Sequence, residues 1–204
     1  MFSSVSSYEE LIQTNIAFIE GKIKFSPYHR GPIDPETIPL LGDLIEINRK
    51  GFISTCGQPF IESEIGFNEK RNIWWETQQL SFIDGYLPKK YISNFVEFMK
   101  TRTNFIYRVY DMKKIFSKWI WFTLLYGFKH YVTVTSERCS KNREQLEHEE
   151  WESYSTIPTD SPDFDFYGYP NIIDILIPYT TRVIIISHNS ESVEKLLLEF
   201  FTSL

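Results

Sequence analysis

The sequence lacks most signatures of well-known enzyme classes. Only two cysteines occur in 204 residues, too few for a disulfide framework, so free thiols in a reducing compartment are expected. No Walker motif, G-x-G-x-x-G, H-E-x-x-H, G-x-S-x-G or C-x-x-C is present. These absences argue against common nucleotide-hydrolysing, dinucleotide-binding and zinc enzymes. No metal site is predicted either, because Glu144 and His148 have no third ligand at a suitable spacing.

The chain also lacks an excess of basic charge and a long hydrophobic run. Its net charge is −6, so general nucleic-acid binding is not expected. The best membrane candidate, residues 115–128, contains Lys118 and is shorter than the roughly 20 apolar residues of a spanning helix. With no signal peptide at the N-terminus, we expect a soluble cytoplasmic protein without membrane attachment. Usage rich in Ile, Lys, Asn, Phe and Tyr would suit an AT-rich genome, such as that of a protist or a large DNA virus. For a viral protein the expected compartment is the host cytoplasm.

The sequence contains enough apolar residues to form the hydrophobic core of one domain over residues 1–204. Aromatic residues make up 17% of the chain, which indicates heavy core packing or an aromatic-lined surface. Helical and alternating patterns both occur. They predict an α+β fold with a mixed or mainly antiparallel sheet of about five to six strands and three to four amphipathic helices.

The most strongly patterned stretch is residues 34–59. A helix is predicted with Pro35 at its first position and Gly51 as the left-handed residue after its end. A short buried strand from Phe52 follows, and Thr55 to Pro59 is expected to leave the sheet as a polar turn. The helical spacing predicts one packed face, made of Ile38, Leu41, Leu44, Ile45 and Asn48.

Other elements are predicted on both sides of this stretch. Ser7 and Glu10 form a capping box that opens a first helix, and Asn189 or Ser190 is expected to cap a final one. A second amphipathic helix opens at Pro88. Strands are predicted over 74–86, 104–110, 119–126, 130–135 and 183–186, with a short strand or helical turn at 172–177 and a loop over 62–72. Residues 137–170 are predicted as a short helix followed by a long surface loop, in a region that is acidic and then rich in Pro and Ser.

The polar turn after the buried strand is the candidate binding site, because polar groups at strand ends often line one. Hydroxyl and amide side chains there can recognise a ligand by directional hydrogen bonds, or can instead satisfy buried backbone groups. Trp74 and Trp75 point to opposite faces of a strand, so one belongs to the core and the other could stack on a ligand or partner. The candidate ligand-binding residues are Asn48, Thr55, Cys56, Gln58, Trp75, Gln78 and Gln79.

The same stretch carries a family resemblance. The order of Asn48, Gly51-Phe52, Thr55 and Gln58-Pro59 resembles that of DUF6919, an uncharacterised domain family. The likeness runs from about Tyr8 to Met99, and its later part rests on Trp75, Gln78, Gln79, Leu80, Phe82 and Gly85-Tyr86. The chain departs from the family pattern at Gly57, Phe60 and Gln79. This resemblance implies no known activity.

A fainter likeness involves the order helix, Asn, Gly, strand, Thr, Cys, Gly. It is similar to the T-x-S-C-x-G motif of the Taw3-like family of wybutosine synthesis, which acts on tRNA with S-adenosylmethionine. That likeness implies an enzyme acting on a nucleotide or RNA. Otherwise the sequence indicates no particular cofactor.

Three functional hypotheses follow. The first is an accessory protein that binds a small molecule or a protein, with a polar pocket at the end of strand 52–56 whose wall includes Gln78 and Gln79. The second is an enzyme, either Taw3-like or thiol-dependent through Cys56 with His188 as a candidate base. The third is a protein-interaction module, of a virus if the compositional hint holds, that uses exposed aromatic side chains and the acidic loop.

Overall fold

The computed structural model describes residues 5–25, 33, 35–110, 132–157 and 172–204. Within these ranges the chain forms two four-stranded sheets, in which every strand pair is antiparallel. The predicted α+β class is confirmed, with eight strands rather than five to six. The predicted strand 119–126 lies outside the described residues.

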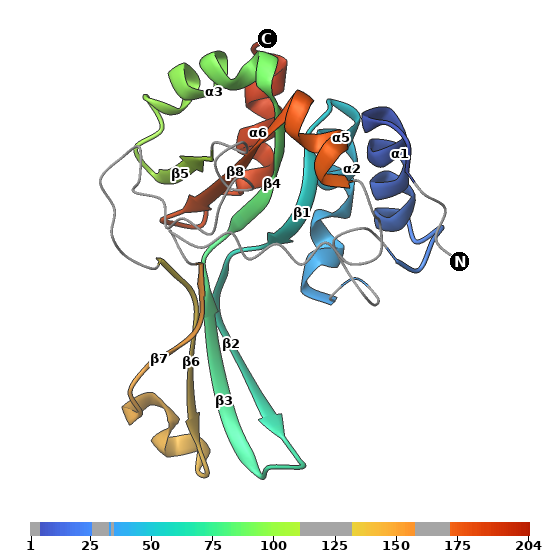
Figure 1. The fold of residues 1–204 in the computed structure, drawn as a ribbon. Helices are drawn as coiled ribbons and strands as arrows, with labels where there is room; N and C mark the ends of the chain where they lie inside the picture. The colour runs from blue at the N-terminus through green and yellow to red at the C-terminus, as the bar shows by residue number, and fades with distance from the viewer. Residues whose placement is uncertain (1–4, 26–32, 34, 111–131, 158–171) are drawn as a thin grey trace.

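The first sheet forms a body and the second an arm that extends away from it (Figure 1). In the body the strand order is β1-β4-β8-β5. All eight residues of β8 are buried, which confirms the central strand predicted from the apolar run 183–186. The bounds of the four strands are Ile53–Gln58 for β1, Phe82–Pro88 for β4, Thr180–Ser187 for β8 and Phe105–Val109 for β5.

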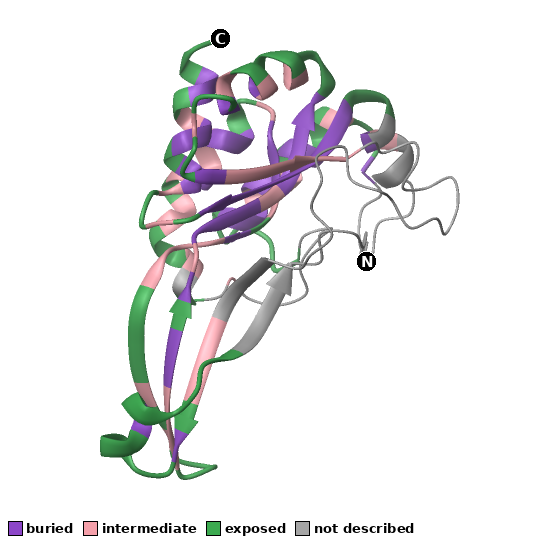
Figure 2. Cartoon of the chain, turned by 90° about the vertical axis from the view of Figure 1, so that its left-hand side faces the viewer, coloured by how far each residue is buried: buried purple, intermediate pink, exposed green. Residues whose placement is uncertain are grey.

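Helices cover both faces of the body sheet. Side chains that alternate along β4 and β8, such as Ile83 and Ile185, pack in one cluster with α2, α3 and α6, whereas Ile53 and Tyr86 pack on the other face with α1 and α5. Figure 2 shows that buried residues concentrate in this body. The helices are α1 (Tyr8–Ile19), α2 (Leu41–Arg49), α3 (Ile92–Met99), α5 (Ile172–Tyr179) and α6 (Val193–Thr202), with a 3₁₀ turn η2 (Lys89–Tyr91) leading into α3. None of the described helices has the length and apolar character needed to cross a membrane.

The helix predicted over 35–50 is divided in two. Residues Pro35–Leu40 form a 3₁₀ turn, η1, before α2 begins at Leu41. The reason is Pro39, which has no N–H to donate and disfavours α conformation at the residue before it. Ile38 is consequently 57% exposed instead of joining the packed face. Gly51 has φ +97°, so the predicted left-handed end of the helix is confirmed.

Two predictions about the following residues are wrong. Thr55 to Gln58 do not leave the sheet but remain in β1, and the predicted loop 62–72 contains β2 (Ile61–Asn68). Most residues of β2 are exposed to solvent, so charged side chains are tolerated along this strand. For this reason its sequence is as polar as that of a loop. β1 does lie at a sheet edge, as Pro59 indicated.

The single strand predicted over 74–86 is two strands in two different sheets. β3 (Ile73–Gln79) belongs to the arm, and the chain then crosses at Leu80 and Ser81 into β4 of the body. Within the arm, β3 pairs closely with β2. A Cβ atom at Gly66 would lie only 2.2 Å from the ring of Trp75, so this position requires glycine.

The arm is completed by β6 (Val132–Ser140) and β7 (Glu152–Ile157), in the order β2-β3-β6-β7. Within 137–157 a 3₁₀ turn stands where a short helix was predicted, whereas strands occupy residues that were expected to be surface loop. Residues 137–140 finish β6, Arg143–His148 form a 3₁₀ turn, η3, and 152–157 form β7. Residues 158–170 lie outside the described ranges.

Helix capping agrees with the sequence at one end of the chain and differs at the other. The Ser7 side chain accepts a hydrogen bond from the Glu10 N–H at 3.1 Å, as a capping box requires. The final helix is capped by Ser192, which accepts from the Lys195 N–H at 3.2 Å. Asn189, one of the two predicted caps, instead forms a turn with the Ser187 hydroxyl.

Three buried polar residues join α1, α2 and β1, and we call them the amide network: Asn15, Asn48 and Ser54. Asn15 Nδ2 donates to Asn48 Oδ1 at 2.8 Å and to the Ser54 carbonyl at 2.9 Å. Asn48 Nδ2 donates to the Ser54 hydroxyl at 2.8 Å and to the carbonyl of Leu44 at 2.7 Å. The network thereby satisfies backbone groups on the outer edge of β1, which no neighbouring strand covers.

Replacing Asn48 with alanine should therefore destabilise the protein strongly. The substitution leaves the buried Asn15 amide and Ser54 hydroxyl short of partners, and we expect the free energy of unfolding to fall by about 2–3 kcal/mol. Urea denaturation measures this change. Asn94→Ala, on the exposed side of α3, is the matched control, with an expected change within about 0.5 kcal/mol. Equal effects of the two substitutions would contradict a structural role for the network.

Candidate functional site

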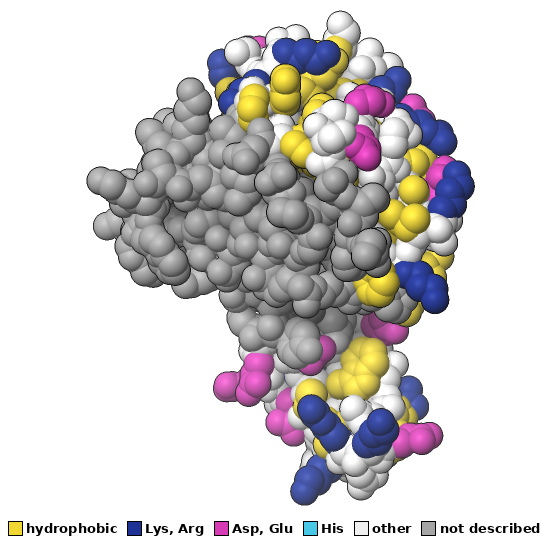
Figure 3. Space-filling model, turned by 45° about the vertical axis from the view of Figure 1, so that its right-hand side comes forward, with side chains coloured by type: hydrophobic (Ala, Val, Ile, Leu, Met, Phe, Trp, Pro, Cys, Tyr) yellow, Lys and Arg dark blue, Asp and Glu magenta, His cyan; other side chains and the backbone are white. Residues whose placement is uncertain are grey.

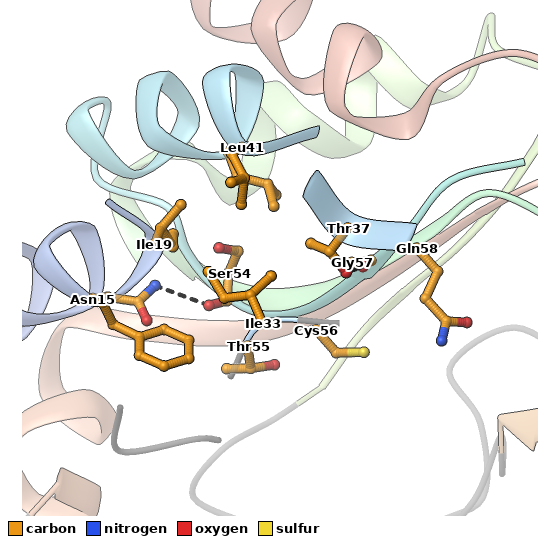
Figure 4. A pocket seen from close by; sticks show the side chains of 12 residues that line it. Asn15, Ile19, Ile33, Thr37, Leu41, Ser54, Thr55, Cys56, Gly57 and Gln58 are labelled. Carbon is orange, nitrogen blue, oxygen red and sulfur yellow. Dashed lines mark hydrogen bonds between the residues drawn. The ribbon is translucent and has the colours of Figure 1, made fainter. Parts of the chain in front are cut away.

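A cleft of about 80 Å³ lies along the outer edge of β1. Figure 4 shows that its lining comes from α1, η1, α2 and β1, with Cys56 and Gln58 at the end towards the arm. The lining residues are Asn15, Phe18, Ile19, Ile33, Thr37, Leu41, Leu44, Ser54, Thr55, Cys56, Gly57 and Gln58. The predicted polar corner therefore opens into a real concavity.

Two hydroxyls of the cleft donate hydrogen bonds to backbone carbonyls of β1 and β4. Thr37 Oγ1 donates to the Gly57 carbonyl at 3.3 Å, and Thr55 Oγ1 donates to the Asp84 carbonyl at 3.0 Å. Each hydroxyl has donated its proton, so its lone pairs remain as acceptors. Both hydroxyls can therefore accept a hydrogen bond from a ligand without breaking a bond of the fold.

The opposite wall of the cleft is apolar. Phe18, Ile19 and Leu44 belong to the buried core, and the partly buried Ile33 and Leu41 pack against the same cluster. A ligand that enters would thus meet hydrocarbon on the helical side and polar groups on the strand side. This combination suits a small amphipathic group.

Cys56 and His188 are not brought together. Cys56 is exposed at the cleft, and it lies across Asp84 from Ile184 in the sheet. His188 is exposed four residues beyond Ile184 and two strands away, which strand geometry places at roughly 16 Å from Cys56. A cysteine and its general base need to be within hydrogen-bond reach. The described residues that line the cleft include no histidine, lysine or arginine.

The other predicted site residues lie elsewhere. Gln79 is buried at the junction of arm and body, where its Nε2 donates to the Pro59 carbonyl at 2.9 Å. Gln78 is exposed on the arm, and Trp75 packs over Gly66. Asn48 belongs to the amide network. Gln78 and Gln79 therefore do not line the cleft, because the chain has crossed into the arm by the time it reaches them.

Sequence reasoning missed the contribution of α1 and η1 to the cleft. Asn15 lies among the apolar residues of α1, and a polar residue on an otherwise buried helix face is a signal that could have been noticed. Thr37 and Ile33 carry no such signal. Their position depends on the turn that Pro39 imposes on the chain.

A fully buried carboxyl lies directly behind the cleft. A Cβ atom at Gly57 would be 3.6 Å from Glu194 Oε1, and that oxygen has no hydrogen-bond partner among the described residues. The other oxygen accepts from the Ser192 hydroxyl at 2.9 Å. Burial, with a smaller contribution from the charge of Asp43, raises the pKa of Glu194, although the Ser192 bond opposes the shift.

Comparison with protein families gives one match. The model of DUF6919, a domain of unknown function, matches residues 2–157. The chain belongs to this family. The match extends well beyond the stretch 8–99 predicted from motifs, and it includes every residue that lines the cleft.

The DUF6919 match also covers all four strands of the arm, whereas α5, β8 and α6 lie outside it. The description of the family names no activity, so it adds none to this chain. A comparison with curated proteins finds no significant match.

The buried carboxyl gives a pH-dependent prediction. In the unfolded chain Glu194 ionises near its ordinary pKa of 4.5, so between that value and the higher folded pKa the native state binds more protons. Stability must then fall as pH rises through this window. Glu194→Gln should remove this loss, so the variant gains stability relative to the wild type as pH increases from about 4.5.

Urea denaturation at a series of pH values measures the effect. Glu62→Gln is the matched control, since it makes the same substitution at an exposed position on β2. If the difference in unfolding free energy between the wild type and Glu194→Gln does not change with pH, the pKa of Glu194 is not raised in the folded protein.

Proposed function

We propose that this DUF6919 protein is a binding protein whose ligand places one compact amphipathic group in the cleft beside β1. The observation that carries the proposal is the pairing of two available hydroxyl acceptors, Thr37 and Thr55, with an apolar wall from α1 and α2. Cys56 and Gln58 lie at the same end of the cleft and complete its polar side.

The size of the cleft restricts the ligand. Its volume of about 80 Å³ is well below the roughly 300 Å³ at which pockets for drug-sized ligands begin. A short branched side chain with an amide or hydroxyl fits this description. A whole S-adenosylmethionine molecule does not, so the cleft favours binding of a small group over the Taw3-like alternative.

The thiol-dependent alternative has less support. A reactive cysteine needs a neighbouring cation, a general base or a helix N-terminus to favour its thiolate. No cationic or imidazole side chain is among the described residues that line the cleft. RNA binding also lacks support in the view of Figure 3, where basic, acidic and hydrophobic side chains intermingle on the described surface.

Binding of a protein partner along the arm is a second candidate function. Ile65 and Phe67 are exposed on β2, and Trp151 is exposed just before β7, the strand at the opposite edge of the arm sheet. Exposed apolar side chains can mark an interaction site. The described residues include nothing that indicates the chemistry of such a partner. The cleft, with its defined polar and apolar sides, therefore ranks first.

Titration with isobutyramide, a branched amide of matching size, tests the cleft. In ¹⁵N-resolved NMR spectra we expect saturable shifts of the Thr55, Cys56 and Gly57 amide signals. Leu41→Phe should fill the apolar side and weaken binding about tenfold or more, a loss of about 1.4 kcal/mol. Ile38→Phe adds the same bulk at an exposed position of η1 outside the cleft and should leave binding unchanged.

Two results would refute the proposal. One is the absence of saturable shifts at β1 with millimolar isobutyramide while the protein remains folded. The other is equal weakening by Leu41→Phe and Ile38→Phe, which would show that the added bulk acts through general destabilisation.

A further inference from the structure

A second and larger hollow, which we call the tyrosine groove, lies where four segments meet. Its volume is about 640 Å³, within the range of pockets that hold small molecules. The walls are the first turns of α1, the end of α2, the residues that follow β4, and the end of α5. Figure 1 shows α1, α2 and α5 side by side at this part of the body.

Cationic side chains from two segments line the groove. Arg49 and Lys50 come from the end of α2, and Lys89 and Lys90 from the turn after β4. Glu9 is the one acidic residue among the described lining residues. In a chain with a net charge of −6, this concentration of positive charge in a concave surface attracts anions selectively.

The cations of α2 are held only loosely by carboxylates. Arg49 lies 3.6 Å from Glu46 and 3.8 Å from Glu20, and Lys50 lies 3.8 Å from Glu46. These pairs are solvent-exposed and longer than a good hydrogen bond, so they are weak. Both side chains can therefore turn towards an anionic ligand at little cost.

Three tyrosines, Tyr8, Tyr91 and Tyr179, also line the groove, and Tyr179 is exposed. The Tyr8 hydroxyl donates to the Gly51 carbonyl, which fixes its ring between α1 and α2. Tyr179 stacks on Tyr8, with ring centres 6.1 Å apart and planes at 28°. Tyr179 is nevertheless 60% exposed, so its outer face is available to stack on a planar ring.

We infer that the tyrosine groove binds a nucleoside polyphosphate. The phosphates would lie between the cations of α2 and those of the turn after β4, and the base would stack on Tyr179. Charge alone would attract any anion, and the exposed tyrosine face adds the preference for a planar ring. This site is separate from the cleft beside β1 and shares no lining residue with it.

Calorimetric titration at low salt tests the assignment with three probes: ADP, adenosine and pyrophosphate. ADP should bind more tightly than either fragment, because it uses both parts of the groove. Binding of ADP and of pyrophosphate should weaken as salt increases, since the contacts are exposed.

Two sets of variants separate the parts of the site. Lys89→Ala/Lys90→Ala should weaken binding of both ADP and pyrophosphate by about tenfold or more. Tyr179→Ala should weaken ADP binding by about fivefold or more and leave pyrophosphate binding unchanged. The matched control is Lys70→Ala/Arg71→Ala, which removes the same charge from the exposed β2–β3 turn of the arm and should leave both affinities unchanged.

Several results would overturn the inference. They are the absence of saturable ADP binding, equal affinity for ADP and pyrophosphate, or equal weakening by the two double variants. A 5′-phosphorylated adenosine decamer distinguishes a free nucleotide from an RNA end. Binding of that decamer more tightly than ADP, with the same response to Tyr179→Ala, would overturn the assignment of a free nucleotide as the ligand.

Discussion

The amide network of Asn15, Asn48 and Ser54 is the constraint on which the arrangement of the body depends. β1 is an edge strand, and an uncovered edge would present unpaired backbone groups to other chains. The network covers that edge with α1 and α2 and fixes both helices against it. One end of α1 then lines the cleft and the other end lines the tyrosine groove. Both candidate sites therefore depend on the same few buried hydrogen bonds.

Body and arm are held together by different forces. The body buries two large apolar clusters on the faces of its sheet, so hydrophobic burial dominates its stability. Among the side chains of the arm whose burial the structure describes, few are apolar and buried, and the arm depends on contacts between neighbouring strands, such as Trp75 over Gly66 and the Glu76–Arg138 ion pair. Gln79, bonded to the Pro59 carbonyl, links the two crossings of the chain between body and arm.

The extent of the family match has a structural consequence. β8 lies between β4 and β5 in the body sheet, yet it follows the matched residues 2–157. The matched part of this chain therefore does not complete the body sheet by itself. The cleft is built entirely from matched residues, whereas the tyrosine groove takes Pro178 and Tyr179 from the C-terminal part. In this chain the cleft therefore lies wholly within the residues that match the family, and the tyrosine groove lies only partly within them.

Local sequence patterns determined the elements whose signals are short-range. The Ser7 cap, the left-handed Gly51, the buried strand at 183–186 and the α+β class could all be predicted, because each depends on neighbouring residues or on simple periodicity. Only the tertiary structure decided that residues 74–86 divide between two sheets, that 62–68 form an exposed strand, and that Asn15 and Thr37 reach β1. The physical reason is that strand pairing and the meeting of distant polar groups depend on contacts far apart in the chain, and no local pattern records them.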